Sequence, residues 1–231
     1  MGDTVVIRVS ASSLGGSACL VVADLAWLAL ARPPGAELLL GWFVTLGAVG
    51  LFLPGVANQV TLARAHLVGP ALVYSLAPSR LLQLAAVVSL AGFSDLVDGA
   101  VARRLRQPSR LGGALDPVVD GLFFGVVAIG LALGGAYPMW LAWLVVGRYA
   151  LPAAAGAVLL LAGRRPVLEH TPLGQVSTTV IGVALGGLAL LRGLGWPAGT
   201  LLLVAEVAIP VAAIGTFANL FWTNRAAVLG R

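Results

Sequence analysis

The sequence DLVDGAVAR at residues 95–103, followed after eight residues by GGALDPVVD at residues 112–120, places acidic side chains inside apolar sequence. These two segments hold four of the nine acidic residues of the chain. A carboxylate near the centre of a membrane helix costs ~2.5–3.5 kcal/mol on insertion scales, so four uncompensated carboxylates would cost on the order of 10 kcal/mol. That cost is comparable to the stability of a whole domain. Cations or a wet cavity must offset it, and a functional site is the default interpretation.

The composition of the rest of the chain is that of an integral membrane protein. The 231 residues are 59% hydrophobic and 10% charged, with a mean hydropathy of +1.00, whereas soluble domains are ~25% charged. The net charge of +5 comes wholly from arginine, because the chain has no lysine. In a membrane protein such an excess reflects loop charges that set orientation, so no nucleic-acid partner is expected.

The apolar runs predict an all-α integral membrane protein, because an open sheet would leave unpaired backbone groups in lipid. Two apolar segments, at residues 17–31 and 38–53, come first, and the former is short for a span of ~20 residues. It is either a short span or an interfacial helix. Six longer candidate spans follow, at residues 60–78, 80–104, 113–134, 138–163, 173–191 and 198–221. We therefore expect an N-terminal extension at 1–56 with one or two apolar helices, and a six-helix transmembrane core at 57–231.

The distribution of arginines between the loops predicts the orientation. Nine arginines lie on the side of the acidic segments and three on the other, which makes the acidic side cytoplasmic. The nine are Arg64, Arg103, Arg104, Arg106, Arg110, Arg164, Arg165, Arg225 and Arg231, and the three are Arg32, Arg80 and Arg192.

Helical geometry gathers the acidic side chains. Because successive residues of a helix turn by about 100°, the first segment presents its acids and small residues on one face, and Asp116 and Asp120 share a face of the next helix. Antiparallel packing of these two helices would bring four carboxylates together just inside the membrane. All-oxygen ligation suits a hard cation such as Mg²⁺ or Mn²⁺, and we expect a two-metal site. The expected metal ligands are Asp95, Asp98, Asp116 and Asp120.

Three other interpretations of the acids are weighed against this one. The carboxylates could form salt bridges with loop arginines, although so many acids at helical spacing exceed what packing requires. Membrane prenyltransferases also carry aspartate-rich helices, on which Mg²⁺ holds a pyrophosphate. A non-catalytic transporter would need no nucleotide-shaped gap between the acids.

The residues between the acids resemble the signature of the CDP-alcohol phosphatidyltransferase family, D-x2-D-G-x2-A-R-x8-G-x3-D-x3-D. All eight specified positions match with the family spacing. The segment Asn58-Gln-Val-Thr61-Leu-Ala-Arg64 is similar to a family P-N-x-x-T-x-x-R segment, with Ala57 where proline is usual. Gly174-Gln175-Val-Ser-Thr178 resembles a G-K-x-x-T segment, with Gln175 in place of the basic residue. The resemblance covers the six spans from Asn58 onward.

This resemblance implies transfer of a phosphatidyl group from a CDP-linked lipid such as CDP-diacylglycerol to a small alcohol or polyol phosphate, with release of CMP, in phospholipid biosynthesis. It implies that Asp95, Asp98 and Asp116 hold metal and that Asp120 is a further ligand and the general base. The residues implied to contact the nucleotide or its phosphates, or otherwise to bind substrate, are Gly99, Ala102, Arg103, Gly112, Asn58, Thr61 and Arg64.

Some polar residues inside the spans fall outside this signature. Arg148 lies mid-span and either binds a phosphate of the acceptor or pairs with Glu206, which lies at similar depth. We expect His66 to be a hydrogen-bonded interior residue rather than a ligand, and Asp24 to face a neighbouring helix or the headgroups. Runs of small residues indicate close helix packing, within the chain or at a homodimer interface.

Overall fold

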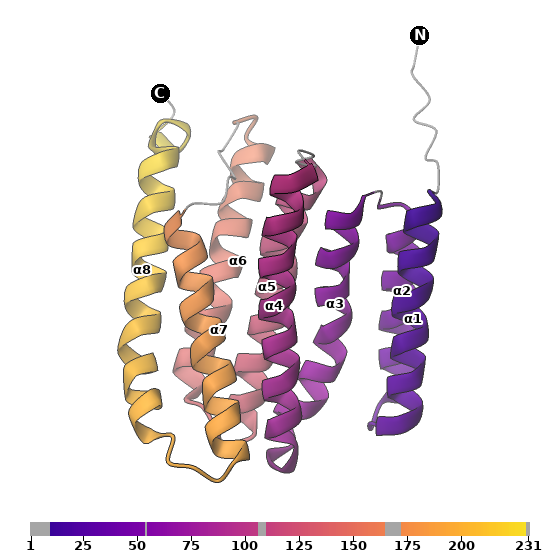
Figure 1. Ribbon diagram of the computed structural model, residues 1–231. Coiled ribbons are helices and arrows are strands. Elements are labelled where there is room, and N and C mark those ends of the chain that lie inside the picture. Colours follow the sequence, from indigo (N-terminus) through magenta and orange to yellow (C-terminus); the bar gives the residue numbers. More distant parts are fainter. Residues whose placement is uncertain (1–9, 54, 106–109, 165–171, 230–231) are drawn as a thin grey trace.

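The computed structural model (Figure 1) describes residues 10–53, 55–105, 110–164 and 172–229, which form eight α-helices and one short 3-10 turn and contain no strand. The helices are α1 (Ala11–Ala31), α2 (Ala36–Leu51), α3 (Val56–Ser75), α4 (Leu81–Leu105), α5 (Arg110–Leu133), α6 (Met139–Leu161), α7 (Pro172–Gly193) and α8 (Gly199–Leu229), with the 3-10 turn η1 at Pro78–Arg80. The all-helical prediction is confirmed.

The helix boundaries follow the predicted spans closely except at two places. Helix α1 begins at Ala11 rather than near residue 17, because the side chain of Ser10 caps it by accepting a hydrogen bond from the backbone N–H of Ser13 at 3.1 Å. An N-cap of this kind satisfies a backbone donor that the first helical turn leaves unpaired. Helix α8 continues to Leu229, beyond the predicted end at residue 221.

Successive helices run in opposite directions (Figure 1). The packing pairs of α3 to α8 form a closed ring. The packing order is α3, α4, α7, α8, α6, α5 and back to α3. Helices α3 and α7 each pack on both acid-bearing helices, α4 and α5. The parts of α4 and α5 that carry the acidic segments lie largely outside the described side chains, so direct packing of these two helices on each other stays a prediction.

The apolar side chains divide between a packed interior and an outward surface. Phe123, Leu141 and Ile209 are fully buried inside the ring, whereas Leu30 and Leu161 are 86% and 89% exposed. Such large exposed apolar side chains are expected where a helix faces lipid. Within the described residues, five helices are long and apolar enough to cross a membrane, at Ala11–Ala31, Leu115–Leu133, Met139–Leu161, Leu173–Gly193 and Gly199–Arg225. These helices indicate a multi-pass membrane protein.

Helices α1 and α2 pack on each other and on α3 through polar and aromatic contacts. Nδ1 of His66 on α3 donates a hydrogen bond to Oδ2 of Asp24 on α1, and both side chains are buried. The ring of Phe43 on α2 stacks on His66, with centroids 6.0 Å apart and planes 5° apart. Nearer the other end of α3, Nε1 of Trp27 donates to the hydroxyl of Tyr74 at 2.7 Å. The expectation that His66 is hydrogen-bonded in the interior is confirmed, and Asp24 faces a neighbouring helix.

We predict that His66→Leu lowers the melting temperature in detergent, because it leaves the Asp24 carboxylate buried without a partner. Leaving a buried hydrogen-bonding group without its partner costs about 1–3 kcal/mol, and more for a charged group, whereas replacing both partners by apolar residues can be nearly neutral. The double variant Asp24→Leu/His66→Leu should therefore melt close to the wild type. A thermal unfolding series by size-exclusion chromatography measures this, and a single variant as stable as the wild type would show that the pair contributes nothing.

Candidate active site

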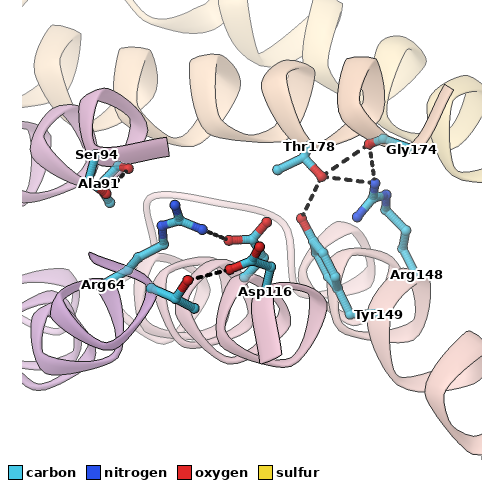
Figure 2. Close-up of polar contacts among 10 residues, drawn as sticks. Arg64, Ala91, Ser94, Asp116, Arg148, Tyr149, Gly174 and Thr178 are labelled. Atoms are coloured by element: carbon cyan, nitrogen blue, oxygen red, sulfur yellow. Dashed lines mark hydrogen bonds and ion pairs between the residues drawn. The ribbon is translucent and has the colours of Figure 1, made fainter. Parts of the chain in front are cut away.

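Two hydrogen bonds join α3 to α5 at the acidic segment. The hydroxyl of Thr61 donates to Oδ1 of Asp116 at 2.6 Å, and Nη1 of Arg64 donates to Oδ1 of Asp120 at 2.5 Å. In Figure 2 the Arg64 side chain points from α3 toward α5, and the Asp116 carboxylate points from α5 toward α3. Residues three or four apart in a helix share a face. The prediction that Asp116 and Asp120 lie on one face of their helix is therefore confirmed, and that face meets α3.

The two pairs differ in charge and burial. Arg64 and Asp120 are 2% and 7% exposed, and form a buried ion pair in which the guanidinium offsets the cost of placing a carboxylate away from water. Asp116 is partly exposed and accepts its hydrogen bond from a neutral hydroxyl. Asn58 lies on α3 one turn before Thr61 and is also buried. Arg64 therefore compensates the charge of the Asp120 carboxylate, whereas Thr61 gives Asp116 a hydrogen bond but no counter-charge.

The remaining residues of the signature lie on the helices where the sequence predicted them. Asp95, Asp98, Gly99, Ala102 and Arg103 belong to the C-terminal part of α4. Gly112 belongs to the first turn of α5. Their side chains lie outside the part that the structure describes, and so does the predicted clustering of all four acids. Among the side chains that are described, no three metal-ligating residues lie together.

A second polar group surrounds Arg148 on α6, which is 5% exposed. Its Nε donates to Oγ of Ser177 at 2.6 Å, and its Nη2 donates to the carbonyl of Gly174 at 2.7 Å and to Oγ1 of Thr178 at 3.1 Å. The guanidinium also lies 4.3 Å from the centre of the Tyr149 ring, a cation–π distance. These four described partners are all neutral, so none of them offers a counter-charge to the guanidinium.

The alternative pairing of Arg148 with Glu206 is not formed. Instead, the charge of Glu206 acts on Tyr137 in the α5–α6 connection, where burial first and Glu206 second raise the pKa of the tyrosine hydroxyl. Arg148 lies deeper in α6, toward the end of the bundle that carries Arg64 and Asp120. The pairing is replaced by hydrogen bonds to α7, whose residues at positions 174, 177 and 178 present three oxygen atoms on one face.

The Arg148 group adjoins Asp120. Tyr149 packs over Gly121 so closely that a Cβ added to this glycine would lie 2.7 Å from the Cβ of Tyr149. The hydroxyl of Tyr149 meets Oγ1 of Thr178 at 3.4 Å. Figure 2 shows this group facing the Arg64 and Asp116 side chains across the interior of the bundle. Tyr149 therefore lies between the helix that carries Asp120 and the Arg148 guanidinium.

The sequence indicated only part of this second group. Gly174 and Thr178 were noted for their similarity to a family segment, but their contact with Arg148 was not predicted. Ser177 and Tyr149 were not singled out. The sequence signal for this group was the helical spacing of Gly174, Ser177 and Thr178, which places their oxygens on one face of the helix. Gln175, one residue after Gly174, is exposed.

Comparison with known protein families decides the family of the chain. Residues 55–217, from the start of α3 to within α8, match the family described as CDP-alcohol phosphatidyltransferase. The chain belongs to this family. Helices α1 and α2 precede the matched region.

Three members of the CDP-alcohol phosphatidyltransferase family show the range of its relatives. The chain is 34% identical over 110 residues to the cardiolipin synthase (CMP-forming) of Streptomyces coelicolor, which is 48% of this chain and 51% of that protein. It is 40% identical over 79 residues to the archaetidylinositol phosphate synthase of Methanothermobacter thermautotrophicus, or 34% of this chain and 40% of that protein. It is 31% identical over 147 residues to the CDP-diacylglycerol–glycerol-3-phosphate 3-phosphatidyltransferase of Bacillus subtilis, or 58% of this chain and 75% of that protein. The chain thus spans about half the length of the first two relatives.

Proposed function

We propose that the protein transfers a phosphatidyl group from CDP-diacylglycerol to the hydroxyl of a polyol that carries a phosphate, with release of CMP. One arrangement carries this proposal: Tyr149 packs beside Gly121 on the helix that carries Asp116 and Asp120, and its neighbour Arg148 is buried with only neutral partners among the described side chains. Carboxylates suit a metal and a base, and the arginine suits a phosphate. The family and the names of its relatives point to the same class of reaction.

We assign the metal-binding role to Asp95, Asp98, Asp116 and Asp120, with Mg²⁺ or Mn²⁺ in a two-metal site. The donors fit a hard cation, because all are carboxylates and the hydrogen bond from Thr61 occupies one of the two oxygens of Asp116. When bound, such an ion would reduce the charge on the pyrophosphate oxygens and make CMP a better leaving group.

The protein's own residues then have distinct tasks. Gly99, Ala102 and Gly112 leave room for the nucleotide, and Arg103 binds its phosphates. Asp120 takes the proton of the acceptor hydroxyl. The acceptor oxygen forms a bond to the phosphorus that carries diacylglycerol, while the bond from that phosphorus to the bridging oxygen breaks. The electron pair of that bond leaves with CMP.

We assign the acceptor phosphate to Arg148. Three hydrogen bonds and the Tyr149 ring hold its guanidinium in place. A charged donor fixed in this way binds phosphate without the entropy loss of ordering a long side chain. Glycerol 3-phosphate and inositol phosphate are acceptors of this kind. Phosphatidylglycerol also combines a hydroxyl acceptor with a phosphate, but in a lipid headgroup.

We further propose that α3 to α8 are the transmembrane core of the enzyme, that α1 and α2 are an extension packed on α3, and that the site faces the cytoplasm. The ends of α1 and α7 and the turn η1, beside or within which Arg32, Arg192 and Arg80 lie in the sequence, share one end of the bundle, whereas α4 ends and α5 begins at the other end (Figure 1). Positively charged loops stay on the cytoplasmic side.

An acceptor panel tests the proposed function. Purified protein is incubated with CDP-diacylglycerol, Mg²⁺ and, separately, glycerol 3-phosphate, inositol phosphate, phosphatidylglycerol or uncharged glycerol, and the lipid product is identified by mass spectrometry. We expect a phosphatidyl product with at least one phosphate-bearing acceptor and little with glycerol. Transfer to glycerol alone would contradict the role of Arg148, and no phosphatidyl product with any acceptor would contradict the function.

We predict that Arg148→Gln raises the KM for the acceptor by about 10–100-fold, because hydrogen bonds to a charged group are worth ~1.5–3 kcal/mol. The KM for CDP-diacylglycerol should change little, since the lost interaction is with the other substrate. Steady-state kinetics with each substrate varied in turn measure both constants.

Glu206→Gln is the matched control, because Glu206 has no ion pair with Arg148 and should leave both constants near the wild-type values. Equal rises in both KM values for Arg148→Gln, together with a lower melting temperature, would show that Arg148 only holds α6 to α7.

A further inference from the structure

The two hydrogen bonds between α3 and α5 form a ladder with matched spacing. The donors Thr61 and Arg64 are three residues apart on α3, and the acceptors Asp116 and Asp120 are four residues apart on α5. Both spacings return to the same helix face after about one turn. Helix α5 thus presents to α3 the two carboxylates to which the proposed function assigns chemistry.

The two donors are directed at the carboxylates of α5 rather than at open space. Thr61 and Arg64 are 4% and 2% exposed, and each donates a hydrogen bond to an acidic side chain of α5. Asp116 is more exposed than either of them. A ligand that approaches Asp116 therefore meets its carboxylate before it meets Thr61.

Each donor fixes one carboxylate oxygen. Thr61 and Arg64 both bond to an Oδ1 atom, which restricts rotation of the carboxyl group and sets the direction of the second oxygen. Residues that hydrogen-bond to a metal ligand in this way fix its orientation, and their loss typically lowers metal affinity or activity by about 10–100-fold.

We propose that Thr61 and Arg64 are positioning residues, which act on the reaction through Asp116 and Asp120 rather than by binding the CDP-linked lipid. This inference rests on the proposed function, because it assumes that Asp116 and Asp120 bind metal. It replaces the substrate-binding role that the resemblance implied for Thr61 and Arg64. The positioning role is not extended to Asn58, which lies on the same face of α3.

The primary test is Thr61→Val, which keeps the shape of the side chain and removes its donor. Binding of Mn²⁺ to the wild type and the variant is measured by electron paramagnetic resonance without any lipid substrate. We expect the dissociation constant for Mn²⁺ to rise by about 10-fold or more. At saturating Mn²⁺ the KM for CDP-diacylglycerol should stay within about two-fold of the wild type, as expected for a residue that makes no contact with this substrate. Thr61→Ser, which restores a hydroxyl, should recover most of the metal affinity.

The matched control is Thr216→Val. Thr216 is a buried threonine on α8 whose hydroxyl donates only to the carbonyl of Ala212 in its own helix, at 2.9 Å. It should bind Mn²⁺ like the wild type. Arg64→Lys supplies a second variant, because it keeps the charge beside Asp120 but loses the geometry of the guanidinium. We expect it to lower kcat more than it changes the KM for CDP-diacylglycerol.

The outcomes separate this inference from the proposed function. If Asp116→Ala weakens Mn²⁺ binding and Thr61→Val does not, the metal site stands and the positioning role is wrong. If Thr61→Val leaves Mn²⁺ binding unchanged but raises the KM for CDP-diacylglycerol, Thr61 contacts the substrate. If Asp116→Ala itself leaves Mn²⁺ binding unchanged, the metal site of the proposed function is wrong, and the positioning role falls with it.

Discussion

Asp98→Ala protein is expected to release no measurable CMP from CDP-diacylglycerol and to bind Mn²⁺ more weakly than the wild type. Asp98 lies on α4, and its carboxylate is one of four assigned to the metal. A hard cation that loses a carboxylate ligand loses both a bond and a compensating charge. CMP release and Mn²⁺ binding are measured on the same preparation.

The control for Asp98→Ala is Glu206→Gln, which removes a different intramembrane acid that lies near Tyr137 and away from the carboxylates of α5. It should retain activity. If instead the Asp98→Ala protein releases CMP at the wild-type rate in Mg²⁺, the assignment of the acids to a metal site is wrong, whatever the activity of the control.

Asp120→Asn is expected to lower kcat by roughly 10²–10⁴-fold, the contribution of a positioned general base. An alcohol hydroxyl is too weak an acid to ionise near neutral pH without one. Asparagine keeps an oxygen that can accept the hydrogen bond from Arg64, so the contact between α3 and α5 should survive. Binding of CDP-diacylglycerol should be largely intact, which confines the loss to the transition state.

Equilibrium binding of CDP-diacylglycerol, single-turnover kinetics and the melting temperature of Asp120→Asn distinguish the roles of this residue. A parallel loss of lipid binding and kcat would make Asp120 mainly a metal ligand. Loss of neither would make it a bystander. A large drop in melting temperature would show that the ion pair with Arg64 serves the fold first, because the variant leaves a buried guanidinium without its counter-charge.

The sequence was sufficient for the fold class and for the position of most helices. Apolar runs long enough to span a membrane, ended by Gly, Pro and Arg, predict helices within a few residues, as at α6 and α7. Local sequence also predicts that Asp116 and Asp120 share a face, because helical geometry alone decides it. The early start of α1 depends on a single serine cap, which is a weaker signal than hydropathy.

Contacts between helices could not be predicted in the same way. Thr61 and Arg64 lie 55 and 56 residues from their partners in sequence. Nothing in the local pattern says that α3 packs against the face of α5 that carries Asp116 and Asp120. Similar depth in the membrane suggested Glu206 as the partner of Arg148, but the rotation of α6 in the ring turns Arg148 toward α7 instead.

The most direct test of the central claim is the release of CMP from cytidine-labelled CDP-diacylglycerol by purified protein with a phosphate-bearing acceptor, followed with and without a divalent-metal chelator. The account predicts one CMP released for each new phospholipid formed, loss of the reaction in chelator and its recovery when Mg²⁺ or Mn²⁺ is restored. Phospholipid formed at an undiminished rate in chelator would contradict it, and so would the absence of CMP when metal and acceptor are both present.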